Sequence, residues 1–217
     1  MKNNLTELVF VIDRSGSMNG LESDTIGGFN SMIEKQRSGE GTVYVSTVLF
    51  STDRVVIHDR RSIEGVDPMT EEQYSVGGCT ALLDAVGSAI HHIGNVHKYA
   101  REEDVPEKTL FVIITDGLEN ASREYSRAQV KRMIERQKEK YGWEFIFLGA
   151  NMDAGEVAED IGIERDRSAT YCCDSVGTSL NYEALEDVIT SVRECGAIRK
   201  EWKKSIEADE RKRGRRR

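Results

Sequence analysis

Short apolar runs alternate with longer amphipathic stretches along most of the chain. The short runs predict six strands, at Leu5–Ile12, Thr42–Phe50, Arg54–Asp59, Lys108–Thr115, Trp143–Gly149 and Ala169–Cys173. The longer stretches predict helices over Leu21–Gln36, Ala81–Ala100, Ser126–Lys140 and Ala154–Ile161, and a final helix marked by Leu185, Val188, Ile189 and Val192. Strands that are apolar almost throughout are buried on both faces, which is typical of a mostly parallel sheet covered by helices.

One pair of strands departs from this alternation. Only Ser51–Asp53 separates Thr42–Phe50 from Arg54–Asp59, and so short a break fits a hairpin. Because hairpin strands run antiparallel, we expect Arg54–Asp59 to be an antiparallel edge strand. The sequence therefore predicts an α/β fold with three layers: a doubly wound (Rossmann-like), mostly parallel six-stranded sheet with one antiparallel edge strand. Residues 60–78 are predicted to be a long loop with one helical turn, because Thr70 and Gln73 have capping-box spacing.

The length of the chain, 217 residues, suits a single domain of this class. We predict that the domain covers residues 1–195. A narrower apolar pattern at Ile198, Trp202 and Ile206 predicts that residues 196–217 form a helical extension and a basic tail.

Charge is unevenly distributed along the chain. The net charge is −8, yet six basic residues lie within Arg211–Arg217, so residues 1–210 carry 24 basic and 38 acidic residues. An acidic body repels phosphate backbones, so we expect no nucleic-acid partner, and we interpret the tail as a solvated end. The first apolar run is short and bracketed by Glu7 and Asp13, so neither a secretory signal nor a membrane span is predicted. Four cysteines without CxxC spacing indicate reduced thiols and a cytoplasmic location.

Oxygen-bearing side chains follow the ends of the predicted strands. Asp13, Ser15 and Ser17 come after the first strand, Thr80 precedes a helix, and Asp116 closes a later strand. If the two strands that carry the aspartates are neighbours, these loops converge in the crevice beyond the carboxyl ends of the sheet. Each motif alone also fits a turn or a helix cap, but their joint placement favours a metal site. Two carboxylates and three hydroxyls suit Mg²⁺, with Mn²⁺ close behind, and do not suit Zn²⁺.

These segments resemble a known metal site. DRSGS (13–17), GGCTALLDA (77–85) and ITDG (114–117) are similar to the metal-ion-dependent adhesion site (MIDAS) of the von Willebrand factor type A (vWA) family. The resemblance covers Leu5 to about Val192, implies a vWA fold with the two Asp-bearing strands side by side, and assigns the ion to Asp13, Ser15, Ser17, Thr80 and Asp116. The stretch 149–154 looks like the stand-alone cytosolic vWA proteins of bacteria and phages. That resemblance implies partners such as an AAA+ ATPase or a stress-response complex.

The resulting functional interpretation is a non-enzymatic protein-binding module. Neutral hydroxyl ligands leave a bound Mg²⁺ electrophilic, so an open coordination position favours a Glu or Asp carboxylate from a partner protein. The alternative is a Mg²⁺-dependent phosphoryl-transfer enzyme of the haloacid-dehalogenase kind, but that chemistry needs a second carboxylate where Ser15 stands. A serine hydrolase lacks support, because no GxSxG surrounds Ser15 or Ser17 and all four histidines precede Asp116. We therefore assign no catalytic residue.

Other polar residues receive structural interpretations. Asn151, Asp153 and Glu119 also follow strand ends, where turn or capping roles are favoured. Three histidines, His91, His92 and His97, lie on one predicted helix without i, i+4 spacing, so we expect surface or packing roles for them. We expect Cys79 to be a small buried residue.

Overall fold

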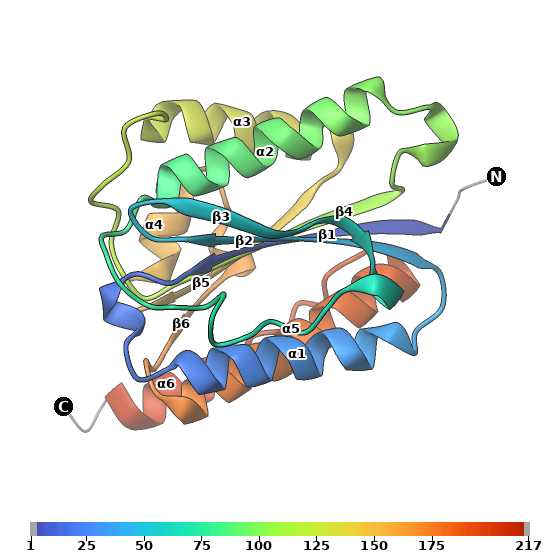
Figure 1. Cartoon of the computed structure of the whole chain (residues 1–217). Coiled ribbons are helices and arrows are strands. Elements are labelled where there is room, and N and C mark those ends of the chain that lie inside the picture. The colour runs from blue at the N-terminus through green and yellow to red at the C-terminus, as the bar shows by residue number, and fades with distance from the viewer. Residues whose placement is uncertain (1–3, 215–217) are drawn as a thin grey trace.

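A computed structural model describes residues 4–214, which form one sheet between two layers of helices (Figure 1). In chain order the elements are β1 (Leu5–Asp13), α1 (Glu22–Arg37), β2 (Thr42–Phe50), β3 (Arg54–Ser62), α2 (Leu82–Tyr99), β4 (Lys108–Thr115), α3 (Arg127–Tyr141), β5 (Glu144–Ala150), α4 (Ala154–Asp160), β6 (Ser168–Tyr171), α5 (Ser175–Cys195) and α6 (Lys204–Gly214).

The sheet has six strands in the order β3-β2-β1-β4-β5-β6. All neighbouring strands are parallel except β3, which pairs antiparallel with β2 at one edge. The predicted fold class is thereby confirmed. Strands β1 and β4 lie side by side, with Ile12 opposite Ile114, so the segments that follow them meet at the same end of the sheet.

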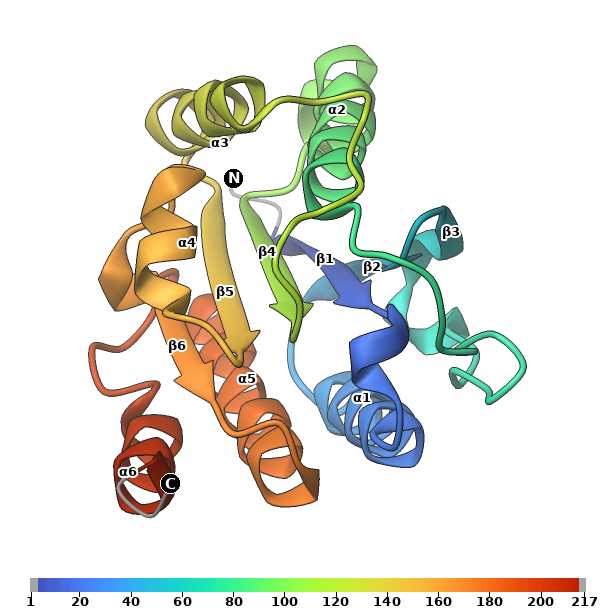
Figure 2. The same cartoon turned by 90° about the vertical axis from the view of Figure 1, so that its left-hand side faces the viewer.

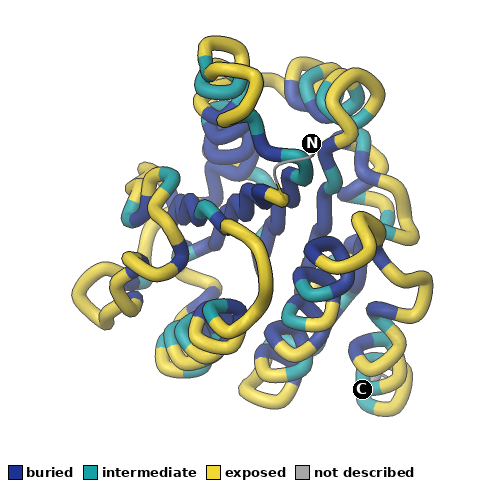
Figure 3. Tube along the Cα trace, turned by 90° about the vertical axis from the view of Figure 1, so that its right-hand side faces the viewer, coloured by how far each residue is buried: buried dark blue, intermediate teal, exposed yellow. Residues whose placement is uncertain are grey.

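Both faces of the sheet are apolar, because successive side chains of each buried strand point to opposite faces. In β1, Leu8, Phe10 and Ile12 join the core beneath α1 and α5, whereas Val9 and Val11 join the core beneath α2 and α3. Figure 1 shows the two helical layers, with α1, α5 and α6 on one face of the sheet and α2 and α3 on the other. Figure 3 shows buried strands between helices whose outer faces are exposed.

Two elements extend beyond their predicted limits. Helix α5 begins at Ser175, well before Leu185, because Asp174 caps it and its first buried turns are polar, with Thr178 and Asn181 in place of apolar residues. Strand β3 runs to Ser62, past its predicted end at Asp59. The register of its pairing with β2 shifts around Thr47, and beyond this shift the two strands stay paired as far as Ser62.

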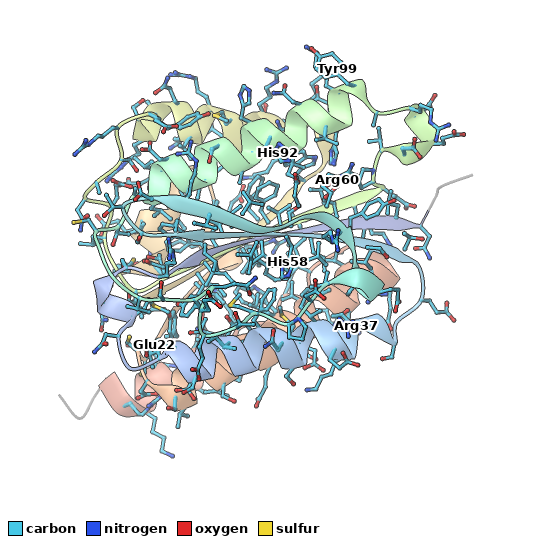
Figure 4. All side chains as sticks on the ribbon, viewed as in Figure 1. Glu22, Arg37, His58, Arg60, His92 and Tyr99 are labelled. Carbon is cyan, nitrogen blue, oxygen red and sulfur yellow. The ribbon has the colours of Figure 1, made fainter. Side chains whose placement is uncertain are left out.

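The segment between β3 and α2 is fixed against the sheet by several side chains. His58 is buried in β3, with Nε2 3.0 Å from the Asp67 carbonyl oxygen and Nδ1 3.0 Å from Thr47 Oγ1. Figure 4 shows this histidine on the α1 side of the sheet. The predicted turn is present: the Tyr74 N–H donates to the Thr70 carbonyl at 3.0 Å, and Thr70 and Gln73 exchange the hydrogen bonds of a capping box.

The predicted helical extension is helical only from Lys204, where α6 begins; residues 196–203 form turns and bends, so Ile198 and Trp202 precede the helix. Helix α6 packs beside the other edge strand, β6. Trp202 and Ile206 belong to the core that covers α5, and the Trp202 indole donates to the Asp166 carbonyl at 2.8 Å. The domain limit at residue 195 stays a prediction, and Arg215–Arg217 of the predicted basic tail lie outside the described residues. Within residues 4–214, every helix is either too short or too polar to cross a membrane.

Candidate metal centre

The structure brings the five predicted side chains together at the carboxyl ends of β1 and β4, the end that faces the viewer in Figure 2. Thr80 Oγ1 donates to Ser15 Oγ at 3.2 Å, and Ser15 Oγ lies 3.1 Å from Ser17 Oγ. Ser17 Oγ in turn donates to Asp116 Oδ1 at 2.5 Å. Three hydroxyls from two distant loops thus form a continuous chain that ends on a carboxylate.

Asp13 is completely buried at the end of β1. Its Oδ1 accepts from the Ser15 N–H at 2.7 Å, and its Oδ2 accepts from Thr115 Oγ1 at 2.6 Å. Burial raises the pKa of Asp13 above its usual value, the two hydrogen-bonding neighbours oppose this, and the charge of Asp116 adds to the rise. The buried carboxylate is therefore costly to ionise without a cation nearby.

The loop after β4 positions Thr80. The Thr80 N–H donates to Asn120 Oδ1 at 2.9 Å, and the Asn120 N–H donates back to the Thr80 carbonyl at 3.0 Å. Glu119 accepts from the Leu83 N–H in the first turn of α2 at 2.9 Å. Both contacts hold the loop that carries Asp116 against the start of the helix that follows Thr80.

Gly117 leaves room at the centre of these groups. A Cβ at this position would lie 2.7 Å from Thr80 Oγ1 and 3.3 Å from Ser17 Oγ, closer than an ordinary contact. A side chain here would press on the hydroxyls themselves, so the local sequence keeps open the space that a ligand of these oxygens would use.

The donor set fits a hard divalent cation. Within residues 4–214, none of the ion pairs includes Asp13 or Asp116, although each is at most 3% exposed. Residues 4–214 contain no group of three or more His, Cys, Asp or Glu side chains that could hold a metal. The predicted site differs from such a group, since it has two carboxylates and its other oxygens are hydroxyls. Two buried carboxylates without a basic partner and three hydroxyls suit Mg²⁺ or Mn²⁺.

Sequence reasoning missed Cys173 at this site. Its thiol donates to Asp116 Oδ2 at 3.4 Å from the segment after β6. Burial and the nearby Asp116 charge raise the pKa of Cys173 to about 11, so the thiol is protonated at neutral pH. No sequence signal links a cysteine to an aspartate 57 residues away, because their contact depends on the order of β4, β5 and β6.

The remaining candidates behave mostly as structural groups. Glu119 accepts from the Ala121 and Ser122 N–H groups, and Asp153 caps α4 by accepting from the Glu156 N–H. Asn151 is exposed and adopts a positive φ of 58°. The expectation for Cys79 was wrong: it is exposed, because the preceding Gly77–Gly78 turn carries it to the surface, where its N–H donates to Thr52 Oγ1.

The predicted surface or packing roles of the three helical histidines agree with their contacts. His92 Nε2 lies 2.8 Å from Asp59 Oδ1, and Figure 4 shows His92 on the α2 side of the sheet. His97 Nε2 lies 3.1 Å from Glu7 Oε2, and its ring meets Trp143 edge-on. His91 is exposed.

Comparisons with known proteins identify the fold. No protein-family model matches the sequence, and no curated protein matches it either. Among solved structures, a von Willebrand factor type A protein from Catenulispora acidiphila matches with a TM-score of 0.56 and 13% identity, over 86% of this chain and 43% of that one. Proximal thread matrix protein 1 from the mussel byssus, solved with a zinc-occupied MIDAS motif, matches with a TM-score of 0.56 and 17% identity, over 83% of this chain and 44% of that one.

A third similar structure is the manganese-loaded TRAP protein of Plasmodium vivax, with a TM-score of 0.55 and 15% identity, over 83% of this chain and 73% of that one. The chain spans less than half the length of the first two structures. At these identities the likeness concerns the fold alone. The chain has the fold of von Willebrand factor type A domains.

Proposed function

We propose that this protein is a metal-dependent protein-binding module that captures a Glu or Asp side chain of a partner through a bound Mg²⁺ or Mn²⁺. The observation that carries the proposal is the convergence of Asp13, Ser15, Ser17, Thr80 and Asp116, without a basic residue to neutralise the two buried carboxylates. These five side chains form a complete MIDAS in this proposal. The zinc-occupied mussel protein and the manganese-loaded Plasmodium protein support divalent-ion binding on this fold.

In this proposal the chain's own residues hold the ion and keep it electrophilic. The hydroxyls of Ser15, Ser17 and Thr80 are neutral, so only two carboxylates offset the charge of a divalent ion. When bound, the ion supplies a positive centre that accepts a carboxylate oxygen from outside. One charge-assisted contact of this kind contributes about 1.5–3 kcal/mol.

The surface beside the site supports a protein as the partner. Leu118, two residues after Asp116, is 59% exposed, and Val176 near the start of α5 is 57% exposed. Exposed apolar side chains gain free energy when a partner covers them, at roughly 25 cal/mol per Å² of buried surface. The acidic body of the chain repels a carboxylate at long range, so the ion itself must provide the attraction.

We propose further that the protein is not an enzyme and acts in the cytoplasm, as do the stand-alone bacterial and phage proteins that it resembles. The protonated Cys173 thiol is a poor nucleophile, and the described contacts of the histidines lie away from Asp13 and Asp116. All four cysteines are free, which supports a reducing compartment. An AAA+ ATPase or a component of a stress-response complex is the partner class to test first.

The test is recovery of a partner from a bacterial lysate on the immobilised full chain. We expect capture in Mg²⁺ and its loss in EDTA and in the double variant Ser15→Ala, Ser17→Ala. Ser179→Ala, at an exposed position in α5, is the matched control and should retain the partner. Calorimetry with Mn²⁺ should show one site in the wild type and none in the double variant.

A partner held with equal affinity in EDTA and by the double variant would contradict the binding mechanism, even if Mn²⁺ binds. Hydrolysis of p-nitrophenyl phosphate that requires Mg²⁺ and is lost in Asp13→Asn would instead favour the phosphatase alternative.

A further inference from the structure

A second candidate site lies between α2 and α3, on the helical layer away from α1 and α5. The cavity measures about 580 Å³, within the range of roughly 300–1,000 Å³ that is usual for small-molecule sites. Its walls come from the C-terminal half of α2, from α3, and from the segments that precede β4 and β5. The metal centre lies at the other end of α2 and of β4, so the two sites are separate.

The floor of this cavity is aromatic and apolar. The Trp143 ring stacks on Phe111 at 5.2 Å and meets the ring of His97 edge-on at 5.3 Å. Met133 and Tyr141 of α3 complete the wall. Trp143 is 5% exposed, so an apolar ring in the cavity would meet the remaining exposed part of Trp143 together with Met133 and Tyr141, and would gain free energy from burial of apolar surface.

The rim of the cavity is cationic. Arg136 of α3 and Lys98 of α2 both line it, and none of the residues that line it is acidic. Within residues 4–214 neither Arg136 nor Lys98 forms an ion pair, although the Lys98 ammonium donates to the Tyr99 hydroxyl at 3.1 Å and lies 4.8 Å from the centre of its ring. Glu7 contacts His97 from the sheet side, but the Arg60 guanidinium already pairs with both of its carboxylate oxygens. An acidic protein thus carries a pocket whose charged lining residues are cations without a carboxylate partner.

A glycine opens the pocket. Gly94 lies in the interior of α2, where glycine costs roughly 1 kcal/mol relative to alanine. A Cβ at this position would lie 3.3 Å from the Gln137 side-chain amide and 4.0 Å from the Trp143 ring. A larger side chain would therefore extend over the aromatic floor and fill the cavity.

We propose that this cavity binds a small aromatic carboxylate, with the ring against Trp143 and the carboxylate at Arg136 and Lys98. The size of the cavity, its aromatic floor and its two cations without a carboxylate partner support this assignment, which is independent of the metal-dependent function.

The test uses the full chain and the anionic aromatic dye 1-anilinonaphthalene-8-sulfonate, which 2-naphthoate or neutral 2-naphthamide then displaces. We expect one dye site per chain, in EDTA as in Mg²⁺. We expect 2-naphthoate to compete about fivefold better than the amide, the effect of one partly exposed charge pair. Arg136→Gln should bring the two competitors within twofold of each other, whereas Arg132→Gln, an exposed position on the same helix, should leave the ratio unchanged.

Blocking variants locate the site. Gly94→Leu should abolish dye binding while the far-UV circular dichroism and the melting temperature remain those of a folded protein, and Gly94→Ala should retain binding. If Gly94→Leu does not fold, the charge-ratio comparison with Arg136→Gln decides the question alone. Equal competition by 2-naphthoate and 2-naphthamide in the wild type, or dye binding that persists in a folded Gly94→Leu variant, would overturn the proposal.

Discussion

Asp13 determines the electrostatics of the metal centre. It is completely buried, its pKa is raised chiefly by burial, and its neighbour Asp116 has the same charge. Because the pKa in the folded protein lies above that in the unfolded chain, the metal-free protein loses stability as the pH rises through the pKa of the folded state. A divalent ion at the proposed site would compensate this loss by neutralising the carboxylate.

We therefore expect Asp13→Asn to stabilise the protein in EDTA at pH 7 by about 1 kcal/mol. The amide still accepts from the Ser15 N–H, and Thr115 Oγ1 can donate to the Gly117 carbonyl, which already lies 3.0 Å away. Urea unfolding in EDTA measures this gain, and added Mg²⁺ should no longer shift the curve. A variant that is less stable than wild type in EDTA would show that the ionised carboxylate supports the metal-free fold.

At this scale the sequence predicted which side chains converge at the proposed metal site, but it did not predict the residues that hold them in place. Asp13, Ser15 and Ser17 stand close together in the chain, so their types and spacing are visible in the sequence. The Cys173–Asp116 contact joins segments 57 residues apart, and the Thr80–Asn120 pair joins segments 40 apart. Contacts of this kind follow from the strand order, which residue spacing does not contain.

Among the elements, the segment from Asp116 to Ser126 depends on one buried side chain of α2. Asp84 accepts from the backbone N–H groups of Arg123, Glu124 and Tyr125 at 2.8–2.9 Å. Together with Glu119, it fastens the whole loop to the start of the helix. The sequence showed Asp84 only as a polar residue in an apolar helical stretch.

Asp84→Ala should lower the free energy of unfolding by about 2–3 kcal/mol, because three N–H groups lose their acceptor. It should also weaken Mn²⁺ binding in calorimetry, because Thr80 is held through the same loop. Asp84→Asn keeps one accepting oxygen, so its free energy of unfolding and its Mn²⁺ affinity should lie between those of the wild type and those of Asp84→Ala. Asp187→Ala, at an exposed site on α5, is the control and should match wild type. If Asp84→Ala is destabilised but binds Mn²⁺ with normal affinity, the loop does not position Thr80 for metal binding.

Strand β3 and the following segment respond to pH through His58. Burial lowers the pKa of His58, although its bond to the Asp67 carbonyl opposes this. The unfolded chain then binds the proton more readily than the folded protein does, so stability is full above the ordinary pKa of about 6.5 and falls as the pH drops below it.

We expect the wild type to lose stability between pH 7.5 and 5.5, by at most about 1.4 kcal/mol per pH unit from this one group. His58→Gln should flatten the slope in urea unfolding. His92→Gln, whose side chain is half exposed, should keep it. An unchanged slope in His58→Gln would assign the pH dependence to other groups.

Over the whole molecule, the number of strands and the antiparallel edge followed from the alternation of strands and helices and from the short break at Ser51–Asp53. The order of the strands did not follow from this pattern, and only the resemblance to vWA domains implied that the two Asp-bearing strands are neighbours. The position of α6 against the rest of the protein could not be predicted from the sequence. The pattern at Ile198, Trp202 and Ile206 predicts an apolar stripe but contains no information about which surface it covers. In the structure the stripe lies against α5 and beside β6, where Lys203 Nζ also donates to the Ser168 carbonyl.

Trp202→Ala should therefore cost about 3–5 kcal/mol in urea unfolding, the usual range for the loss of a buried large aromatic side chain. Trp202→Phe should cost less, because it keeps most of the contact and loses the bond to the Asp166 carbonyl. Lys204→Ala is the exposed control on α6. A loss below 1 kcal/mol in Trp202→Ala would mean that the turn before α6 contributes little to the stability of the sheet.

The pairing of β1 with β4 also affects the timing of folding during synthesis. Ser17 and Asp116 are 99 residues apart in the chain, yet they share a hydrogen bond. At a translation rate of about 5–20 residues per second, Asp13 and the two serines are synthesised roughly 5–20 s before Asp116. During that interval the apolar strand β1 has β2 beside it on one side and an open edge on the other. We therefore expect this edge of β1 to be open to pairing with another chain until β4 is synthesised.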